Sequence, residues 1–219
     1  MNFFGLILTI ILFSIFKKLN LKIPILISVG ISIILILKIF NINYVKYNES
    51  SSILSFLIAP ATIALAYPMY KNHHILLTNK RALYPPLVLA TIIAIISTYF
   101  CAKFFGADFK VIISMLPKST TMPIALEISK NINGICEITA VVVALTGVFG
   151  GAFGHKILKL LKIKNDVSIG LALGSASHVI GTAACADRKK DKQVAASTIA
   201  LIIVGLLSTI IIPFFENLY

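Results

Sequence analysis

Long apolar runs joined by short basic connections constrain this chain more than any other feature. A helix of about 20 mostly apolar residues is long enough to cross a hydrocarbon core. Runs of roughly this kind lie at residues 2–16, 23–40, 53–70, 84–105, 134–155 and 194–215. Two further apolar runs, at 111–129 and 167–186, are interrupted by polar and small residues. We therefore expect an all-α integral membrane protein.

Composition supports the same class of protein. Hydrophobic residues make up 58% of the 219 residues and charged residues only 13%, outside the range of ordinary globular domains. The net charge of +12 could indicate nucleic-acid binding, but the basic residues lie in short loops between apolar runs. That placement is typical of loops on the cytoplasmic side of a membrane. We expect the lipid bilayer and no nucleic acid as a partner, and one transmembrane domain over residues 1–219.

The basic residues also discriminate between two topologies. If both interrupted runs cross the bilayer, the chain has eight transmembrane helices. Its basic residues other than Lys118 then lie eleven on one side of the membrane and eight on the other. If both turn back within the bilayer, the chain has about six transmembrane helices and two re-entrant or broken helical hairpins. Fourteen of the same basic residues then lie on one side of the membrane and five on the other. The second topology obeys the positive-inside rule better. It places the hairpins on opposite sides in an inverted repeat, an arrangement that recurs in secondary transporters.

The first interrupted run contains a candidate anion site. Pro117 and Pro123 bracket a stretch that is poorly suited to regular helix, because proline lacks an amide donor and disfavours helix in the residue before it. Between them lie Lys118 and the hydroxyl residues Ser119, Thr120 and Thr121. A cation beside hydroxyls and free helix amides suits a small anion. The alternative is that Lys118 reaches the membrane surface and the hydroxyls cap the following helix.

The second interrupted run places a histidine among small residues. Gly174 and Gly181 permit close helix approach or a chain reversal. Between them lie Ser177 and His178, and Thr182 follows. An intramembrane histidine in such a break is a candidate ligand donor or proton carrier. The alternative is a structural histidine whose hydrogen bonds are satisfied within the protein.

Nothing in the sequence predicts an enzyme. No paired carboxylates, nucleophile with an adjacent base, phosphate-binding loop or metal-ligand cluster stands out. The cysteines, Cys101, Cys136 and Cys185, are far apart, and we interpret them as small buried residues. We expect no cofactor and no metal.

Three motifs in order resemble the LrgB/CidB family over essentially the whole chain. They are Pro-Ala-Thr-x-Ala-Leu-Ala-x-Pro-x-Tyr at 60–70, Pro-Lys-Ser-Thr-Thr-x-Pro-Ile-Ala at 117–125, and His-x-x-Gly-Thr-Ala at 178–183. The resemblance implies a multi-pass protein of the bacterial inner membrane. It also implies two kinds of function. Some members are named antiholin-like or holin-like modulators of murein hydrolase activity and lysis that act with a small LrgA/CidA-type partner. Relatives that include a plastid glycolate/glycerate translocator carry small carboxylates.

The opposed polar breaks favour the carrier, because a lesion-forming holin has little use for them. We predict alternating-access transport of a pyruvate-like or glycolate-like anion by a homo-oligomer. In this hypothesis the carboxylate meets Lys118, while His178 and Thr182 contact the other end of the substrate or relay a proton. The predicted substrate-binding residues are Lys118, Ser119, Thr120, Thr121, Pro123, Ser177, His178, Gly181 and Thr182.

Overall fold

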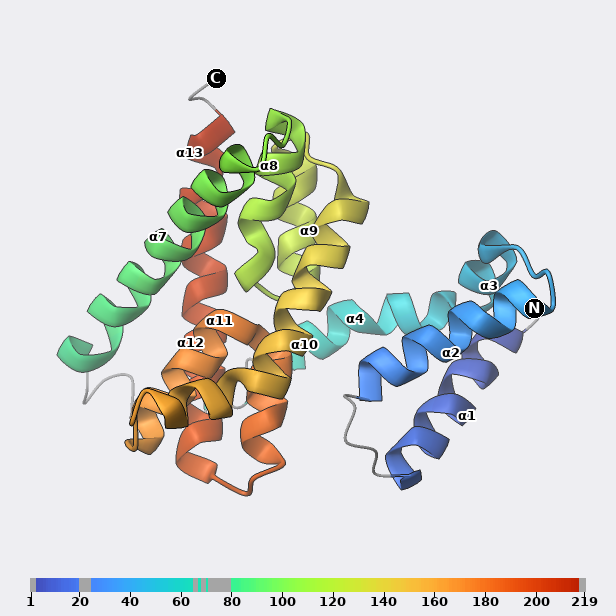
Figure 1. Ribbon diagram of the computed structural model, residues 1–219, viewed down its shortest axis with the longest axis horizontal. Coiled ribbons are helices and arrows are strands. Elements are labelled where there is room, and N and C mark those ends of the chain that lie inside the picture. Colours follow the sequence, from blue (N-terminus) through green and yellow to red (C-terminus); the bar gives the residue numbers. More distant parts are fainter. Residues whose placement is uncertain (1–2, 20–24, 65–66, 68–69, 71–79, 217–219) are drawn as a thin grey trace. The chain divides into compact units, whose positions relative to one another are not determined.

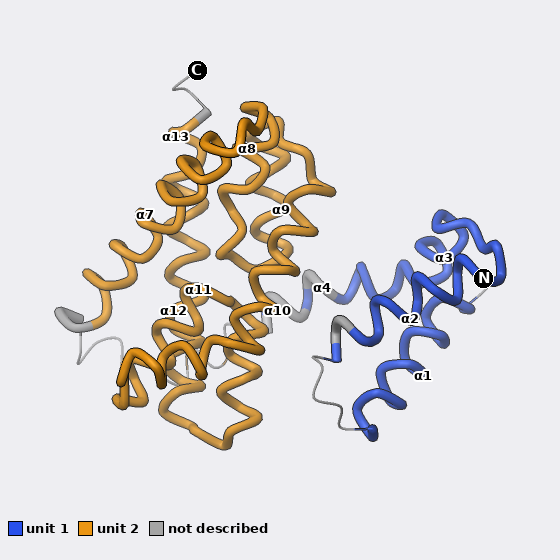
Figure 2. The backbone as a smooth tube through the Cα atoms, in the orientation of Figure 1, with its two compact units in different colours: residues 1–64 blue, residues 65–219 orange. Residues whose placement is uncertain are grey.

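The computed structural model describes residues 3–19, 25–64, 67, 70 and 80–216. Every regular element in these ranges is helical, which confirms the predicted all-α class. The chain divides into two compact units, residues 1–64 and 65–219 (Figure 2). The prediction of a single domain over residues 1–219 stays a prediction.

Four helices lie in the described part of the first unit. They are α1 (Phe4–Leu19), α2 (Ile25–Ile39), α3 (Tyr44–Ser50) and α4 (Ser52–Ala64). Helix α3 was not predicted, because its residues are mostly polar. It is tied to α1 by a hydrogen bond from the Gly5 amide to Ser50 Oγ, at 2.9 Å, and by the Thr9 and Tyr47 hydroxyls, 2.8 Å apart. Most of the predicted run at 53–70 beyond Ala64 lies outside the described residues.

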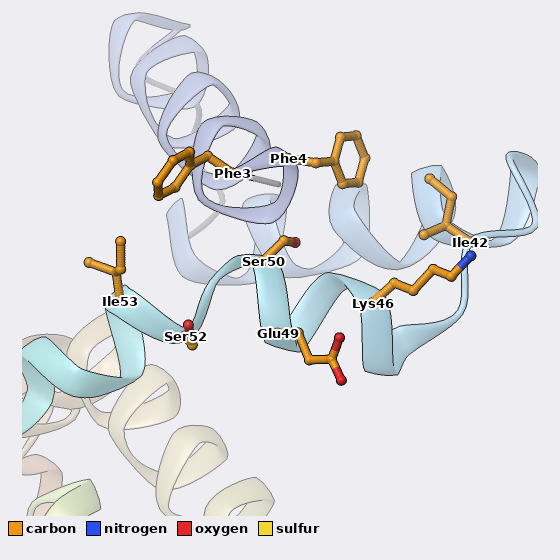
Figure 3. Close-up of a pocket in the computed structure, with 8 residues that line it drawn as sticks. All are labelled: Phe3, Phe4, Ile42, Lys46, Glu49, Ser50, Ser52 and Ile53. Atoms are coloured by element: carbon orange, nitrogen blue, oxygen red, sulfur yellow. The ribbon is translucent and has the colours of Figure 1, made fainter. Parts of the chain in front are cut away.

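A cavity of about 500 Å³ lies in the first unit (Figure 3). Phe4 of α1 and Phe3 just before it form one wall, and Ser50 lies across from them. The two charged residues at its edge, Lys46 and Glu49, are both exposed. None of the residues predicted to bind substrate lies here.

The second unit holds the longest helices. They are α7 (Lys80–Phe104), α10 (Cys136–Leu160), α11 (Asp166–Ala186) and α12 (Asp191–Ile211), followed by the short α13 (Pro213–Glu216). Within the described residues, these four segments are the ones long and apolar enough to cross a membrane. Exposed apolar side chains recur every fourth residue on α10, at Val141, Leu145, Phe149 and Phe153. A continuous apolar face of this kind suits an apolar environment, and two of its residues, Leu145 and Phe149, also line the cavity described below.

Residues 109–131 form a first hairpin between α7 and α10 (Figure 1). It consists of α8 (Phe109–Met115), the 3₁₀ helix η1 (Leu116–Ser119) and α9 (Met122–Asn131). The hydroxyl of Thr139 on α10 lies 2.7 Å from the Ser114 carbonyl oxygen of α8 and 2.8 Å from the Ser129 hydroxyl of α9. Both arms therefore lie against the same turn of α10, and the chain reverses between them.

Replacing Thr139 with valine is expected to destabilise the first hairpin. The change keeps the shape of the side chain and removes the hydroxyl that joins the three helices. We expect a loss of about 1 kcal/mol, the scale of such bonds within membranes. Denaturation of the purified protein by a detergent titration measures this.

Thr209→Val is the matched control, because the Thr209 hydroxyl bonds only the Gly205 carbonyl of its own helix, at 2.9 Å. Equal midpoints for the two variants would contradict the joining role of Thr139.

Residues 166–186 form a second hairpin, because α11 reverses at His178. The backbone of His178 has φ 42° and ψ −133°, far from helical values. A Cβ on Gly181 would lie 2.3 Å from the Leu173 carbonyl oxygen, eight residues earlier, whereas that separation in a straight helix is about 12 Å. Ser197 of α12 confirms the reversal. It donates a hydrogen bond to Thr182 on one arm, and its backbone closely approaches Gly174 on the other.

The two hairpins contact opposite ends of α10. The first bonds near its start, through Thr139 and through the Ile135 amide to Ser114 Oγ at 2.7 Å. The second meets α10 near its end. There Gln193 of α12 lies 2.9 Å from His155 of α10 and 2.7 Å from Asp166, the first residue of the second hairpin. The tips of the hairpins meet beside the middle of α10 (Figure 1).

Apolar packing holds these elements together. One buried cluster joins the first hairpin to α7 and to the end of α12. It contains Ile113 and Ile128 of the hairpin, Ile95 of α7 and Ile212 after α12, so the hairpin is anchored between the two long helices. A second cluster joins α7 to α12, and a third contains Leu158, Leu173 and Cys185. The buried Cys185 agrees with the interpretation made from sequence, whereas Cys101 is exposed.

Candidate functional site

The tip of the first hairpin is an irregular segment, as the two prolines predict. Pro117 lies within η1, and the chain is extended at Thr120 (φ −101°, ψ 176°) and Thr121 (φ −71°, ψ 150°). Helix α9 then begins at Met122, with Pro123 in its first turn, where a missing amide donor costs nothing. The break therefore places Lys118 and Ser119 at the end of the hairpin.

The tip of the second hairpin packs on a glycine-rich face of α10. A Cβ on Gly150 would lie 1.5 Å from Ser177 Oγ, and one on Gly147 would lie 2.5 Å from the His178 ring. Side chains at these positions would exclude the tip. The glycines therefore let Ser177 and His178 approach the α10 backbone.

A cavity of about 780 Å³ lies where the two tips meet. Lys118 and Ser119 reach it from the first hairpin, and Ser175, Ala176 and Ser177 reach it from the second. The remaining walls come from α7, α10 and the first arm of α11, and they are mostly apolar. They are formed by Ala90, Ile93, Ala94, Leu145, Thr146, Phe149, Gly150, Gly154, Ile157, Leu158, Ala172 and Leu173.

Among the described residues that line this cavity, Lys118 is the one cation. Its Nζ lies 3.5 Å from Ser119 Oγ, and its side chain is half-buried. Within the described part of the chain, the single ion pair joins Lys130 to Glu127 at 3.9 Å, so Lys118 has no carboxylate partner there. A cation in an apolar cavity without a counter-ion is an electrostatic site for an anion.

Three of the predicted substrate-binding residues line the cavity and six do not. Lys118, Ser119 and Ser177 line it, whereas Thr120, Thr121, Pro123, His178, Gly181 and Thr182 lie behind the tips. Fully buried Thr120 donates to the Pro117 carbonyl at 2.9 Å. Thr121 Oγ1 is buried and has no hydrogen-bond partner. The first hairpin thus turns most of its hydroxyls inward.

His178 lies against α10, with the geometry of the structural alternative. Its Nε2 is 3.1 Å from the Val143 carbonyl oxygen, and the residue is 4% exposed. Thr182 donates to the His178 carbonyl at 3.1 Å and accepts from Ser197 at 2.8 Å. Gly181 packs against the Leu173 carbonyl, as described above. These three residues hold the second hairpin in its reversed form.

Sequence reasoning missed the apolar walls of the cavity. Ile93 and Phe149 are ordinary members of apolar runs, and nothing local marks them as facing a cavity. Gly150 and Gly154 offered a signal, because four glycines fall within residues 147–154 on one side of a helix. Such a face indicates a close neighbour.

The fold and this cavity together define an all-helical membrane protein in which two broken segments meet beside an uncompensated lysine. Comparison with known proteins places it more closely. The chain belongs to the LrgB-like family, whose model matches residues 6–218. No solved structure is significantly similar to it.

The relatives cover almost the whole chain. The "Antiholin-like protein LrgB" of Bacillus subtilis (strain 168) is 34% identical over 223 residues, which span 99% of this chain and 96% of the relative. The protein of the same name in Bacillus mycoides (strain KBAB4) is 33% identical over 97% of this chain and 95% of its own length. An uncharacterized protein of Haemophilus influenzae is 34% identical over 84% of this chain and 80% of its own length.

Proposed function

We propose that this protein is a secondary carrier of small carboxylate anions in the bacterial inner membrane, and not an enzyme. One observation carries the proposal. Lys118 faces an apolar cavity at the meeting point of two broken helical segments and has no counter-ion among the described residues. Polar groups at such depth in a membrane protein mark ligand or ion pathways.

The carboxylate would bind Lys118 Nζ and the Ser119 hydroxyl on the first tip. Ser177 on the second tip faces the same cavity and offers a hydroxyl to another polar group of the substrate. The other predicted residues, from Thr120 and Thr121 to His178 and Thr182, would act by shaping the two tips. The mostly apolar walls suit the carbon skeleton of a pyruvate-like or glycolate-like anion.

Both hairpins are proposed to be re-entrant, which makes the second unit an inverted-topology repeat. Asp166 at the start of α11 contacts Gln193 near the start of α12, so the basic segments at 156–164 and 187–192 lie at the same end of the second unit. That is the distribution on which the topology with fourteen basic residues on one side depends. Interchanging the conformations of the two halves would open the cavity alternately to each side. The total number of membrane crossings remains part of the proposal.

The names of the relatives favour a second candidate. Proteins 33–34% identical to this chain are named antiholin-like. In that role the chain would modulate murein hydrolase activity and lysis together with an LrgA-type membrane partner. A homo-oligomer is compatible with either candidate.

Vesicle measurements separate the two candidates. The purified full-length protein is placed in proteoliposomes that contain a large dye, and uptake of labelled pyruvate or glycolate is followed. The carrier predicts saturable uptake with the dye retained. Absence of saturable uptake, with or without dye release, would contradict the carrier and favour the second candidate, and dye release would add that the chain itself forms lesions.

A further inference from the structure

A hydrogen-bonded chain of three polar side chains joins three helices near the end of α10. His155 of α10 has its Nε2 atom 2.9 Å from Gln193 Oε1 of α12. The Gln193 amide nitrogen donates to Asp166 Oδ1, 2.7 Å away at the start of α11. Gln193 is only 4% exposed, and His155 and Asp166 on either side of it are half-buried.

The chain fixes which nitrogen of His155 carries the proton. An ionised carboxylate accepts hydrogen bonds and cannot donate them, so the Gln193 NH₂ group must face Asp166. The Gln193 oxygen then faces His155 and accepts from Nε2–H. In the neutral ring, Nδ1 is left with a bare lone pair.

The Nδ1 atom of His155 is buried and has no hydrogen-bond partner among the residues that the structure describes. Among buried side-chain polar atoms in the described ranges, only Thr121 Oγ1 shares this state. Leaving such an atom unpaired is costly. Addition of a proton at Nδ1 would keep the Nε2–H bond to Gln193 intact. The imidazolium would also be linked through Gln193 to the Asp166 carboxylate, so its charge would be balanced.

Most charged residues at the end of α10 and at the starts of α11 and α12 are basic. The charged residues lie on α10 itself, on the loop after it, and on α11 and α12. They are Lys156, Lys159, Lys162, Lys164, Asp166, Asp191 and Lys192. Within the described residues none of them makes an ion pair with the imidazole, and Asp166 is the one connected to it by hydrogen bonds, through Gln193.

The location couples this group to the cavity. The cavity is lined by residues close to His155 on α10, which are Gly154, Ile157 and Leu158. Asp166 begins the second hairpin, whose tip carries Ser177 into the same cavity. A charge change at His155 would therefore act where the hairpin meets both long helices.

We propose that His155 is a proton-binding site that couples carboxylate movement to proton movement. The inference rests on the proposed carrier function. Nδ1 takes one proton from water on the side where the anion enters and returns it to water on the other side. One proton accompanies one monovalent anion, so the loaded protein carries no added net charge.

Transport under a pH gradient tests the coupling. Proteoliposomes with wild-type protein and an acidic exterior should accumulate labelled pyruvate about tenfold per pH unit, the ratio that one coupled proton allows. Exchange of labelled for unlabelled pyruvate without a gradient is measured in the same vesicles, and protein-free vesicles give the passive leak. In His155→Gln the ratio of accumulation to exchange should fall about tenfold. An unchanged ratio would overturn the proton site, because a merely structural role lowers both rates together.

A spectroscopic experiment tests the site without transport. Nitrogen NMR of histidine-labelled wild type and His155→Gln isolates the His155 signals by difference. We expect the neutral ring to carry its proton at Nε2 at the alkaline end of a pH series and a second proton to appear at Nδ1 at the acidic end. In Asp166→Asn the Gln193 amide is free to turn, and both tautomers should appear. A ring that stays neutral throughout would overturn the inference, whereas absence of any pyruvate uptake or exchange would overturn the proposed function instead.

Discussion

Lys118→Met is expected to lower pyruvate or glycolate uptake about tenfold to a hundredfold while leaving the protein folded. Methionine keeps the length and apolar body of the side chain and removes the charge. A charge-assisted hydrogen bond contributes about 1.5–3 kcal/mol to binding, which corresponds to this loss of affinity. Initial uptake rates in proteoliposomes over a range of substrate concentrations give the measurement.

The same substitution is expected to leave thermal stability equal or raised. Lys118 is half-buried and has no carboxylate partner among the described residues, so the folded protein bears a desolvation cost that methionine removes. Loss of uptake with retained stability separates a binding role from a structural one. The thermal midpoint in detergent, read by light scattering or intrinsic fluorescence, provides this second value.

Lys130→Met serves as the matched control. The Lys130 and Glu127 side chains are 64% and 67% exposed, and their contact at 3.9 Å is of the kind that contributes little. Its uptake should match that of the wild type. If Lys118→Met transported normally, or if Lys130→Met lost as much uptake, the assignment of Lys118 to the anion site would be wrong.

Gly174→Ala is expected to separate the second hairpin from α12. The added Cβ would lie 2.2 Å from the Ser197 carbonyl oxygen and 2.7 Å from the Ser197 Cα. Backbone atoms cannot rotate away as a flexible side chain does, so the two helices must move apart. Such overpacking costs about 1–3 kcal/mol and would disturb the bond from Ser197 to Thr182. Thermal unfolding in detergent and the yield of monodisperse protein report the effect.

Gly30→Ala is the control for this prediction. Gly30 lies within α2, and a Cβ there would meet no atom within 4 Å. Alanine also has the higher helix propensity. The variant should unfold at or above the wild-type temperature. If both alanine variants behaved alike, the close approach of α11 and α12 would not contribute to stability.

The apolar runs predicted the long helices because a helix that contacts lipid must consist mostly of apolar residues. The runs at 84–105 and 134–155 correspond to α7 and α10, although both helices extend past the predicted ends into basic residues. Pro117 and Pro123 predicted the break in the first hairpin, since proline acts on the backbone beside it. Glycines around His178 predicted the second break for a similar local reason.

The partners of the site residues were not predictable in the same way. His178 was predicted to contact substrate, but its ring bonds the carbonyl of Val143, thirty-five residues away. Gln193 carries no local signal, and its importance depends on its position between His155 and Asp166. Contacts between residues so far apart in the sequence depend on how the hairpins pack, and that packing cannot be predicted from one sequence alone.

The glycine-rich face of α10 has a consequence for the solvent in which the chain can fold. Four glycines, at 147, 150, 151 and 154, lie within a span of two helical turns. In water each would weaken the helix by about 1 kcal/mol relative to alanine, because glycine loses more backbone freedom and leaves its peptide groups open to water. Inside a bilayer no water competes for those peptide groups, and the helix persists. The smooth surface that receives the second hairpin is therefore suited to an apolar environment, a bilayer or a detergent micelle, and poorly suited to water.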